Sequence, residues 1–219
     1  MERKNFTNAG NSTFYRSLPI GQMSTWIEAS GLADTPELDL IIENLSYSRE
    51  ILEIGAAEGR VVQGLLDRGY EGTICAVERN EERCDFLRSK FENNIGVKVL
   101  QRDILKDELP FCETGLWLWA GITEFNPVEQ RTAIQKLSRY ISKLLIIDVP
   151  AQGSKTNATT SSSNKTFEIE TTWGSLIGYF PCREEIMNYI SGTKFDLTKV
   201  IPYRTSSDRE RELYLLRVR

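Results

Sequence analysis

The sequence predicts an α/β protein with a seven-stranded, mostly parallel sheet, helices on both faces and an antiparallel strand at the carboxyl end. Short apolar runs alternate with longer amphipathic segments between about residues 34 and 149, a pattern typical of parallel sheets with right-handed crossovers. Two further apolar runs, 195–203 and 212–218, flank the polar Thr205-Ser206-Ser207-Asp208, as expected for an antiparallel hairpin. The length of 219 residues suits one domain.

Each element has a local reason. Asp34-Thr35-Pro36-Glu37 places a capping residue and an early proline before an apolar stripe, so a helix is expected there. The predicted strands are 51–54, 73–77, 97–101, 116–120, 144–149, 195–203 and 212–218. The predicted later helices, identified by apolar periodicity, are about 58–68, 81–93, 127–141 and 183–190.

Two regions are less regular. Residues 1–33 are polar but too rich in aromatic side chains for a disordered tail, so we expect this segment to pack over the active site. Residues 34–219 are expected to form the main domain. A flexible loop is predicted within it at about 151–172, where Ser, Thr, Asn and Lys accumulate.

The composition limits the partners. The net charge of -4 and the lack of a dense basic block argue against nucleic acid. No apolar run of about 18 residues is present, so no membrane span is expected, and the polar N-terminus predicts a cytoplasmic location. Four cysteines without a CxxC pair, and no histidine, predict no metal site. A homodimer is left open.

The segment Ile51-Leu52-Glu53-Ile54-Gly55-Ala56-Ala57-Glu58-Gly59-Arg60 carries the clearest chemical signal. It is a buried strand running into a turn of small residues that opens a helix, where a backbone can approach a ligand closely. A dinucleotide-binding turn would require glycine at positions 55, 57 and 60. Ala57 and Arg60 occupy two of these positions, which argues against a nicotinamide enzyme.

Two acidic residues follow the next strands in order. Glu78 ends the second predicted strand, where a carboxylate can accept hydrogen bonds from ribose hydroxyls. Asp103 follows the third strand and is placed to accept from an adenine amino group. Either residue alone could be a solvated or capping acid. Together they indicate an adenosine-binding site.

From about residue 34 to residue 219 the chain resembles a class I S-adenosylmethionine (SAM)-dependent methyltransferase of no identified subfamily. The resemblance rests on the glycine turn, Val77-Glu78-Arg79, Gln101-Arg102-Asp103-Ile104, Trp117-Leu118-Trp119-Ala120-Gly121 and the terminal hairpin. It implies a Rossmann-like methyltransferase fold with SAM as cofactor. The cofactor-binding residues that it implies are Glu53, Gly55, Ala57, Gly59, Glu78, Arg79, Asp103, Ile104, Trp119 and Ala120.

The fourth strand departs from two branches of that family. Trp119-Ala120-Gly121-Ile122-Thr123-Glu124 stands where enzymes that methylate exocyclic base nitrogens carry an Asn-Pro-Pro-Tyr type motif. Pro181-Cys182 lies too far downstream to be the nucleophile of a cytosine-ring enzyme. The resemblance therefore does not identify the acceptor.

Residues on the acceptor side are predicted from their positions. Glu124 and Asp148 follow or end the fourth and fifth strands, and are the candidates for orienting an acceptor or taking its proton. Glu124 could instead be a surface or capping acid. Tyr15, Arg16, Trp173 and Tyr179 are candidates for lining the acceptor pocket, and their alternative role is to hold their segments to the core.

The function predicted from these observations is methyl transfer from SAM to an oxygen or nitrogen of a small-molecule acceptor. A protein or peptide methyltransferase is the first alternative. A catalytically silent SAM-binding module is the second, and a nicotinamide oxidoreductase is the least favoured.

Overall fold

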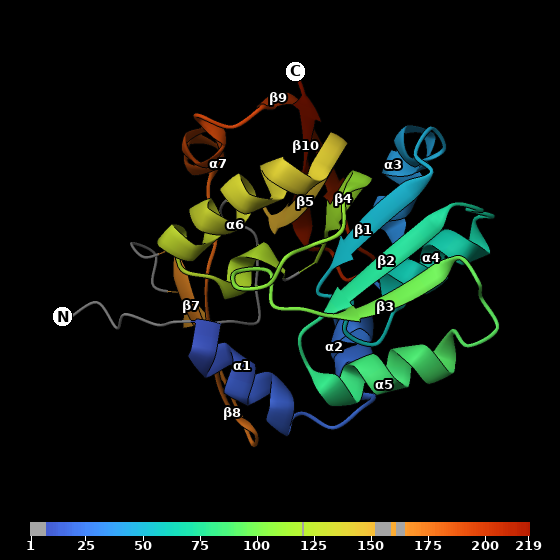
Figure 1. The fold of residues 1–219 in the computed structure, drawn as a ribbon. Helices are drawn as coiled ribbons and strands as arrows, with labels where there is room; N and C mark the ends of the chain where they lie inside the picture. The colour runs from blue at the N-terminus through green and yellow to red at the C-terminus, as the bar shows by residue number, and fades with distance from the viewer. Residues whose placement is uncertain (1–7, 120, 152–158, 161–164) are drawn as a thin grey trace.

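The structure, a computed structural model, describes residues 8–119, 121–151, 159–160 and 165–219. Its main sheet has seven strands in the order β3-β2-β1-β4-β5-β10-β9 (Figure 1). All neighbouring strands are parallel except that β10 runs antiparallel to both β5 and β9, so the predicted fold class is confirmed. The strands are β1 (Glu50–Ile54), β2 (Thr73–Glu78), β3 (Val97–Gln101), β4 (Cys112–Trp117), β5 (Ile141–Pro150), β9 (Phe195–Arg204) and β10 (Glu210–Val218).

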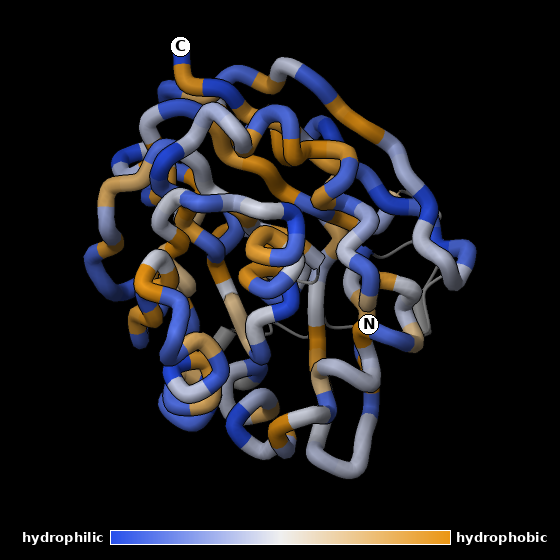
Figure 2. Tube along the Cα trace, turned by 90° about the vertical axis from the view of Figure 1, so that its right-hand side faces the viewer, coloured by the Kyte–Doolittle hydropathy of each residue, from blue (hydrophilic) through white to orange (hydrophobic). Residues whose placement is uncertain are grey.

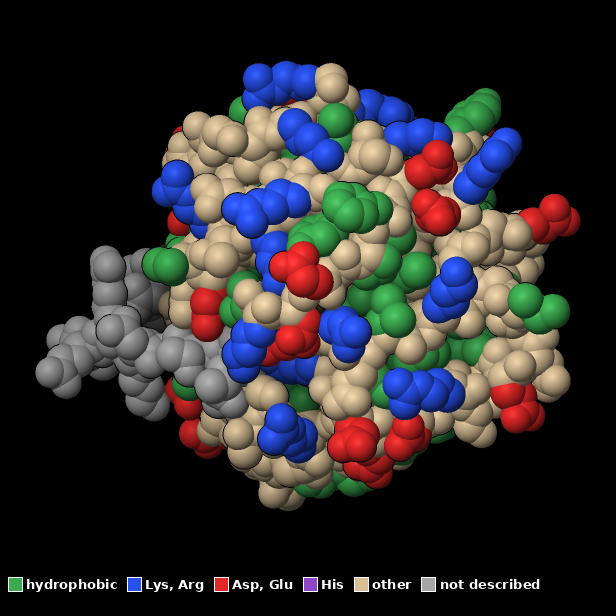
Figure 3. Space-filling view, in the orientation of Figure 1, with side chains coloured by type: hydrophobic (Ala, Val, Ile, Leu, Met, Phe, Trp, Pro, Cys, Tyr) green, Lys and Arg blue, Asp and Glu red, His purple; other side chains and the backbone are tan. Residues whose placement is uncertain are grey.

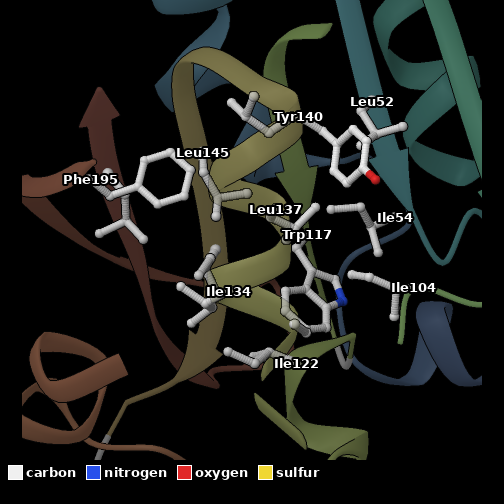
Figure 4. Packing of buried hydrophobic residues seen from close by; sticks show 14 of the residues in the cluster. Leu52, Ile54, Ile104, Trp117, Ile122, Ile134, Leu137, Tyr140, Leu145 and Phe195 are labelled. Atoms are coloured by element: carbon white, nitrogen blue, oxygen red, sulfur yellow. The ribbon is translucent and has the colours of Figure 1, made fainter. Parts of the chain in front are cut away.

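Helices cover both faces of this sheet, because strand side chains alternate between them. Leu52 and Ile54 contribute to the core under α6 and α7, and Figure 4 shows Leu52 near Tyr140 and Ile54 near Trp117. Ile51 contributes to the core under α3, α4 and α5. In Figure 2, hydrophobic residues lie along the segments that run through the middle of the molecule. The helices are α3 (Pro36–Leu45), α4 (Arg60–Asp67), α5 (Glu81–Lys90), α6 (Pro127–Tyr140) and α7 (Arg183–Ile190).

A third hydrophobic cluster lies apart from these two cores. It joins the N-terminal helices α1 (Asn8–Ser17) and α2 (Gln22–Ala29) to the strands β7 (Thr166–Thr171) and β8 (Gly174–Tyr179). These four elements are called the cover below, and Figure 1 shows them beyond the carboxyl ends of β1 and β2. With β6 (Thr159–Thr160), β7 and β8 form a small antiparallel sheet. The buried residues of the cluster are Phe14, Leu18, Met23, Phe167 and Leu176.

Two sequence predictions need correction. The fourth strand is 112–117 and not 116–120, because the chain leaves the sheet after Trp117 and Trp119 takes a left-handed conformation with φ of 58°. The flexible loop predicted at about 151–172 contains β7, whose Phe167 faces the cover cluster. Positions 152–158 and 161–164 of that loop lie outside the described residues.

Candidate cofactor and acceptor site

A cavity of about 90 Å³ lies where β1, β2 and β4 end. Sites for small organic ligands usually measure about 300–1,000 Å³, so this one is small. Tyr15 of α1 and Met23 of α2 form part of its wall. The remaining lining residues are Ile54, Gly55, Ala57, Val77, Glu78, Arg79, Arg83, Arg102, Asp103, Ile104, Trp117, Leu118, Trp119, Gly121, Glu124 and Phe125.

The turn after β1 brings backbone to this cavity. Gly55 has φ of 74°, and a Cβ added to it would meet no atom within 4 Å. Gly59 also has a positive φ, but a Cβ there would lie 2.6 Å from the Phe91 ring, and Gly59 does not line the cavity. Gly55 therefore leaves room for a ligand, whereas Gly59 allows the start of α4 to pack on α5.

Glu78 connects the end of β2 to this turn. Its Oε2 accepts a hydrogen bond from the Ala57 amide at 3.0 Å, and its Oε1 accepts from the amides of Arg79 and Asn80, both at 2.8 Å. A carboxylate has about four acceptor positions. Glu78 therefore has about one acceptor position left for a ligand at the cavity surface.

Six of the predicted cofactor residues line this cavity together with Glu78. They are Gly55, Ala57, Arg79, Asp103, Ile104 and Trp119. Asp103 Oδ1 accepts from the Leu105 amide at 2.9 Å, which turns the chain after β3. Ala120 lies outside the described residues. Glu53, like Gly59, does not line the cavity.

Glu53 lies in the sheet below the turn. Its side chain is buried, and its Oε2 has no hydrogen-bond partner among the described residues. Burial raises the pKa of Glu53 to about 8, although Arg60 opposes the shift. Glu53 is therefore mostly protonated near neutral pH.

Replacing Glu53 by glutamine is expected to reduce the pH dependence of stability. Because the folded pKa of about 8 exceeds the ordinary value of 4.5, the stability from this group is complete below about pH 4.5 and is lost as pH rises through about 8. Urea unfolding between about pH 6 and about pH 9 should show the wild type losing on the order of 3 kcal/mol more than Glu53→Gln. Glu92→Gln, at an exposed position, is the control. Equal losses in all three proteins would contradict the prediction.

Glu124 meets two side chains from distant segments at the cavity wall. It ends the short helix η1 (Ile122–Glu124). Tyr15 Oη donates to its Oε1 at 2.5 Å, and Arg79 Nη2 lies 3.9 Å from its Oε2. Burial raises the pKa of Glu124 to about 7, against the lowering effects of Arg79 and Tyr15. This position does not fit a solvated surface acid.

Asp148 has a different environment. Its side chain is fully buried and does not line the cavity. Its oxygens accept from Arg211 Nε at 3.0 Å, from the Trp119 amide at 3.0 Å and from Tyr203 Oη at 3.1 Å. The predicted catalytic role of Asp148 does not fit this geometry, because the carboxylate is occupied and cannot reach an acceptor in the cavity.

Of the four predicted acceptor residues, the structure places only Tyr15 at the cavity. Arg16 is exposed. Trp173 packs edge-on against Trp26, with ring centroids 6.5 Å apart, and the Tyr179 hydroxyl donates to Glu185. These contacts match the alternative role of holding segments together.

Several lining residues had no signal in the sequence. Met23 and Phe125 come from segments whose positions depend on the tertiary fold. Arg83 is buried in α5, and its guanidinium donates to the carbonyl oxygens of Tyr15 at 2.6 Å and Leu18 at 3.3 Å. It thereby holds α1 over the cavity.

Two kinds of site are absent from the described residues. They contain no group of three or more His, Cys, Asp or Glu side chains that could hold a metal ion. No helix in the same part of the chain combines the length and apolarity needed to cross a bilayer.

Comparison with known proteins relates the fold, but not the sequence, to others. No protein-family model matches the chain, and no curated protein matches it either. Among solved structures, magnesium protoporphyrin IX methyltransferase from Synechocystis with bound SAM is similar over 100% of both chains, with a TM-score of 0.67 and 10% identity.

Two other solved structures give the same result. Glycopeptide N-methyltransferase MtfA complexed with SAM has a TM-score of 0.67 at 12% identity, covering 85% of this chain and 94% of its own. A SAM-dependent methyltransferase from Clostridium acetobutylicum has a TM-score of 0.64 at 10% identity, covering 86% and 92%. Together with the strand order, these similarities show that the chain has the fold of the class I SAM-dependent methyltransferases.

Proposed function

We propose that this protein transfers a methyl group from SAM to an oxygen or nitrogen of a small-molecule acceptor. The observation that carries the proposal is the convergence of Gly55, Glu78 and Asp103 on one cavity at the carboxyl ends of the parallel strands. Open α/β sheets bind their ligands at that edge. When bound, SAM would supply an activated methyl group on a sulfonium.

The lining residues would contact the parts of SAM in order. The open space at Gly55 would accommodate the methionine part. Glu78 would use its remaining acceptor position for the ribose hydroxyls, and Asp103 and Ile104 would contact the adenine. The cavity of about 90 Å³ is small for an organic ligand, so we expect the cover to move outward when SAM binds.

Glu124 would act on the acceptor. Methyl transfer by in-line displacement depends mainly on alignment and exclusion of water, and a base is needed only when the acceptor arrives protonated. A carboxyl with a pKa of about 7 is suited to take that proton near neutral pH. Tyr15, bonded to Glu124, would orient the carboxylate and keep water from the cavity.

A small acceptor is favoured over a protein because the site is covered. Tyr15 and Met23 of the cover form part of the cavity wall, whereas a protein substrate needs an open groove. On the face in Figure 3, positive and negative side chains are interspersed, without a patch of one sign. SAM turnover with a small-metabolite extract, compared with a protein extract, separates the two: turnover with protein alone would overturn the small-molecule proposal.

Cofactor binding is tested with a matched pair of glycine variants. Gly55→Ala places a methyl group in the proposed ligand space, whereas Gly69→Ala imposes the same backbone strain elsewhere, since Gly69 has φ of 73° and no atom within 4 Å of an added Cβ. We expect calorimetry to show SAM and S-adenosylhomocysteine (SAH) binding at least about tenfold weaker in Gly55→Ala and unchanged in Gly69→Ala.

The same titrations decide between the alternatives. Binding of NAD instead of SAM would favour a nicotinamide oxidoreductase. Folded wild-type protein that binds neither SAM nor SAH would overturn the proposed function. Cofactor binding without turnover on any extract would favour a SAM-binding module.

A further inference from the structure

Trp119 lines the cavity and has a strained backbone. Its φ is 58°, in the left-handed region. A bulky side chain disfavours this left-handed region, because its Cβ crowds the backbone. Such a conformation persists only where the surroundings enforce it, and it concentrates at functional sites.

The buried ion pair of Asp148 and Arg211 makes hydrogen bonds to the backbone amide and the carbonyl oxygen of Trp119. The Trp119 amide donates to Asp148 Oδ2 at 3.0 Å. Arg211 Nη2 donates to the Trp119 carbonyl oxygen at 2.9 Å. Asp148 lies near the end of β5 and Arg211 near the start of the neighbouring antiparallel strand β10, so the two contacts come from paired strands of the main sheet.

Asp148 and Arg211 also make several contacts with each other. Arg211 Nε lies 3.0 Å from each Asp148 oxygen, and Arg211 Nη2 lies 2.9 Å from Oδ2. Tyr203 adds a hydrogen bond to Asp148, and burial together with the nearby carboxylate raises the pKa of Tyr203. Burial lowers the pKa of Arg211, but the carboxylate and Tyr203 raise it by more, so Arg211 stays charged. Buried pairs contribute little net stability but can impose a specific geometry.

We propose that Asp148 and Arg211 are positioning residues that fix Trp119 in its left-handed conformation and so shape the wall of the cofactor cavity. The Trp119 side chain also packs against the cover cluster. Its position therefore affects both the cofactor space and the closed position of the cover. The inference rests on the proposed function in taking this cavity as the SAM site.

A double-mutant cycle tests whether Arg211 acts through Trp119. Arg211→Lys keeps the positive charge, but one ammonium group cannot reproduce the planar set of bonds to Asp148 and to the Trp119 carbonyl. Trp119→Gly removes the indole and accepts the left-handed conformation without strain. Arg204→Lys, in an exposed ion pair at the end of β9, is the control.

Two readouts are compared across the cycle, the Kd for SAH by calorimetry and the near-ultraviolet circular dichroism of the free protein. We expect Arg211→Lys to weaken SAH binding about tenfold and to change the tryptophan signal. In the Trp119→Gly background, Arg211→Lys should change neither, because its effect is transmitted by Trp119. Arg204→Lys should match the wild type.

Additive effects in the double variant, or wild-type behaviour of Arg211→Lys, would overturn the inference. If Arg211→Lys does not fold, Tyr203→Phe replaces it in the cycle, since it removes one bond to Asp148 and should give a smaller shift that again depends on Trp119. The circular dichroism readout needs no ligand. Absence of SAH binding by the wild type would therefore count against the proposed function and leave the positioning inference to the spectroscopic cycle.

Discussion

Replacing Glu124 by glutamine is expected to slow methyl transfer by about 10²–10⁴-fold, with SAH binding nearly unchanged. Glutamine can still accept the hydrogen bond from Tyr15, so the cavity wall is preserved, but it cannot take a proton. The measurement is SAM-to-SAH turnover with an acceptor found in the metabolite screen, together with calorimetry of SAH.

The pH profile gives this prediction a second, independent readout. The pKa of Glu124 is about 7, and the ionised form is the one able to act as base. In the wild type, kcat/KM should therefore rise up to about pH 7 and level off above it, and Glu124→Gln should lack that limb. Glu92→Gln is the control for loss of one exposed carboxylate. An unchanged rate or an unchanged limb in Glu124→Gln would exclude Glu124 as the base.

Replacing Asp148 by alanine is expected to lower the free energy of unfolding by about 3–5 kcal/mol. The substitution leaves the buried Arg211 guanidinium without its carboxylate, and the Trp119 amide loses its acceptor. For a chain of this size the melting temperature should fall by roughly 6–20 °C. Thermal and urea unfolding measure both quantities.

The control for Asp148→Ala is an exposed member of another Arg–Asp pair. Asp85 lies 2.7 Å from Arg88 at the surface, where such pairs contribute about 0–1 kcal/mol. Asp85→Ala should therefore unfold almost like the wild type. A similar small effect for both variants would mean that the buried pair is not needed for the fold.

The main sheet could be predicted because its strands are short, apolar and separated by amphipathic helices. The predicted position of β4 was wrong by a few residues. The prediction followed the most apolar run, Leu116-Trp117-Leu118-Trp119, whereas the strand begins at Cys112 and ends at Trp117. The strand β7 was missed inside a segment rich in Ser and Thr. Its alternation of Phe167 and Ile169 with glutamates is the period-two signal that could have indicated it.

The site was predictable where neighbouring strands determine it and unpredictable where distant segments meet. Gly55 and Glu78 follow adjacent parallel strands, so their proximity follows from the topology. The role of Asp148 depends on Arg211, which is 63 positions further along the chain. No local pattern shows that partner, so a buried structural acid looked like a catalytic one.

The cover is built from two parts of the chain that lie outside the main sheet. The first part, α1 with α2, precedes β1, and the second, β7 with β8, follows β5. Phe14 and Leu18 from the first part pack with Phe167 and Leu176 from the second. The two parts therefore constitute one exchangeable unit. A chimera with altered acceptor preference would have to inherit both from the same parent, because either alone would expose apolar surface and lose its packing partner.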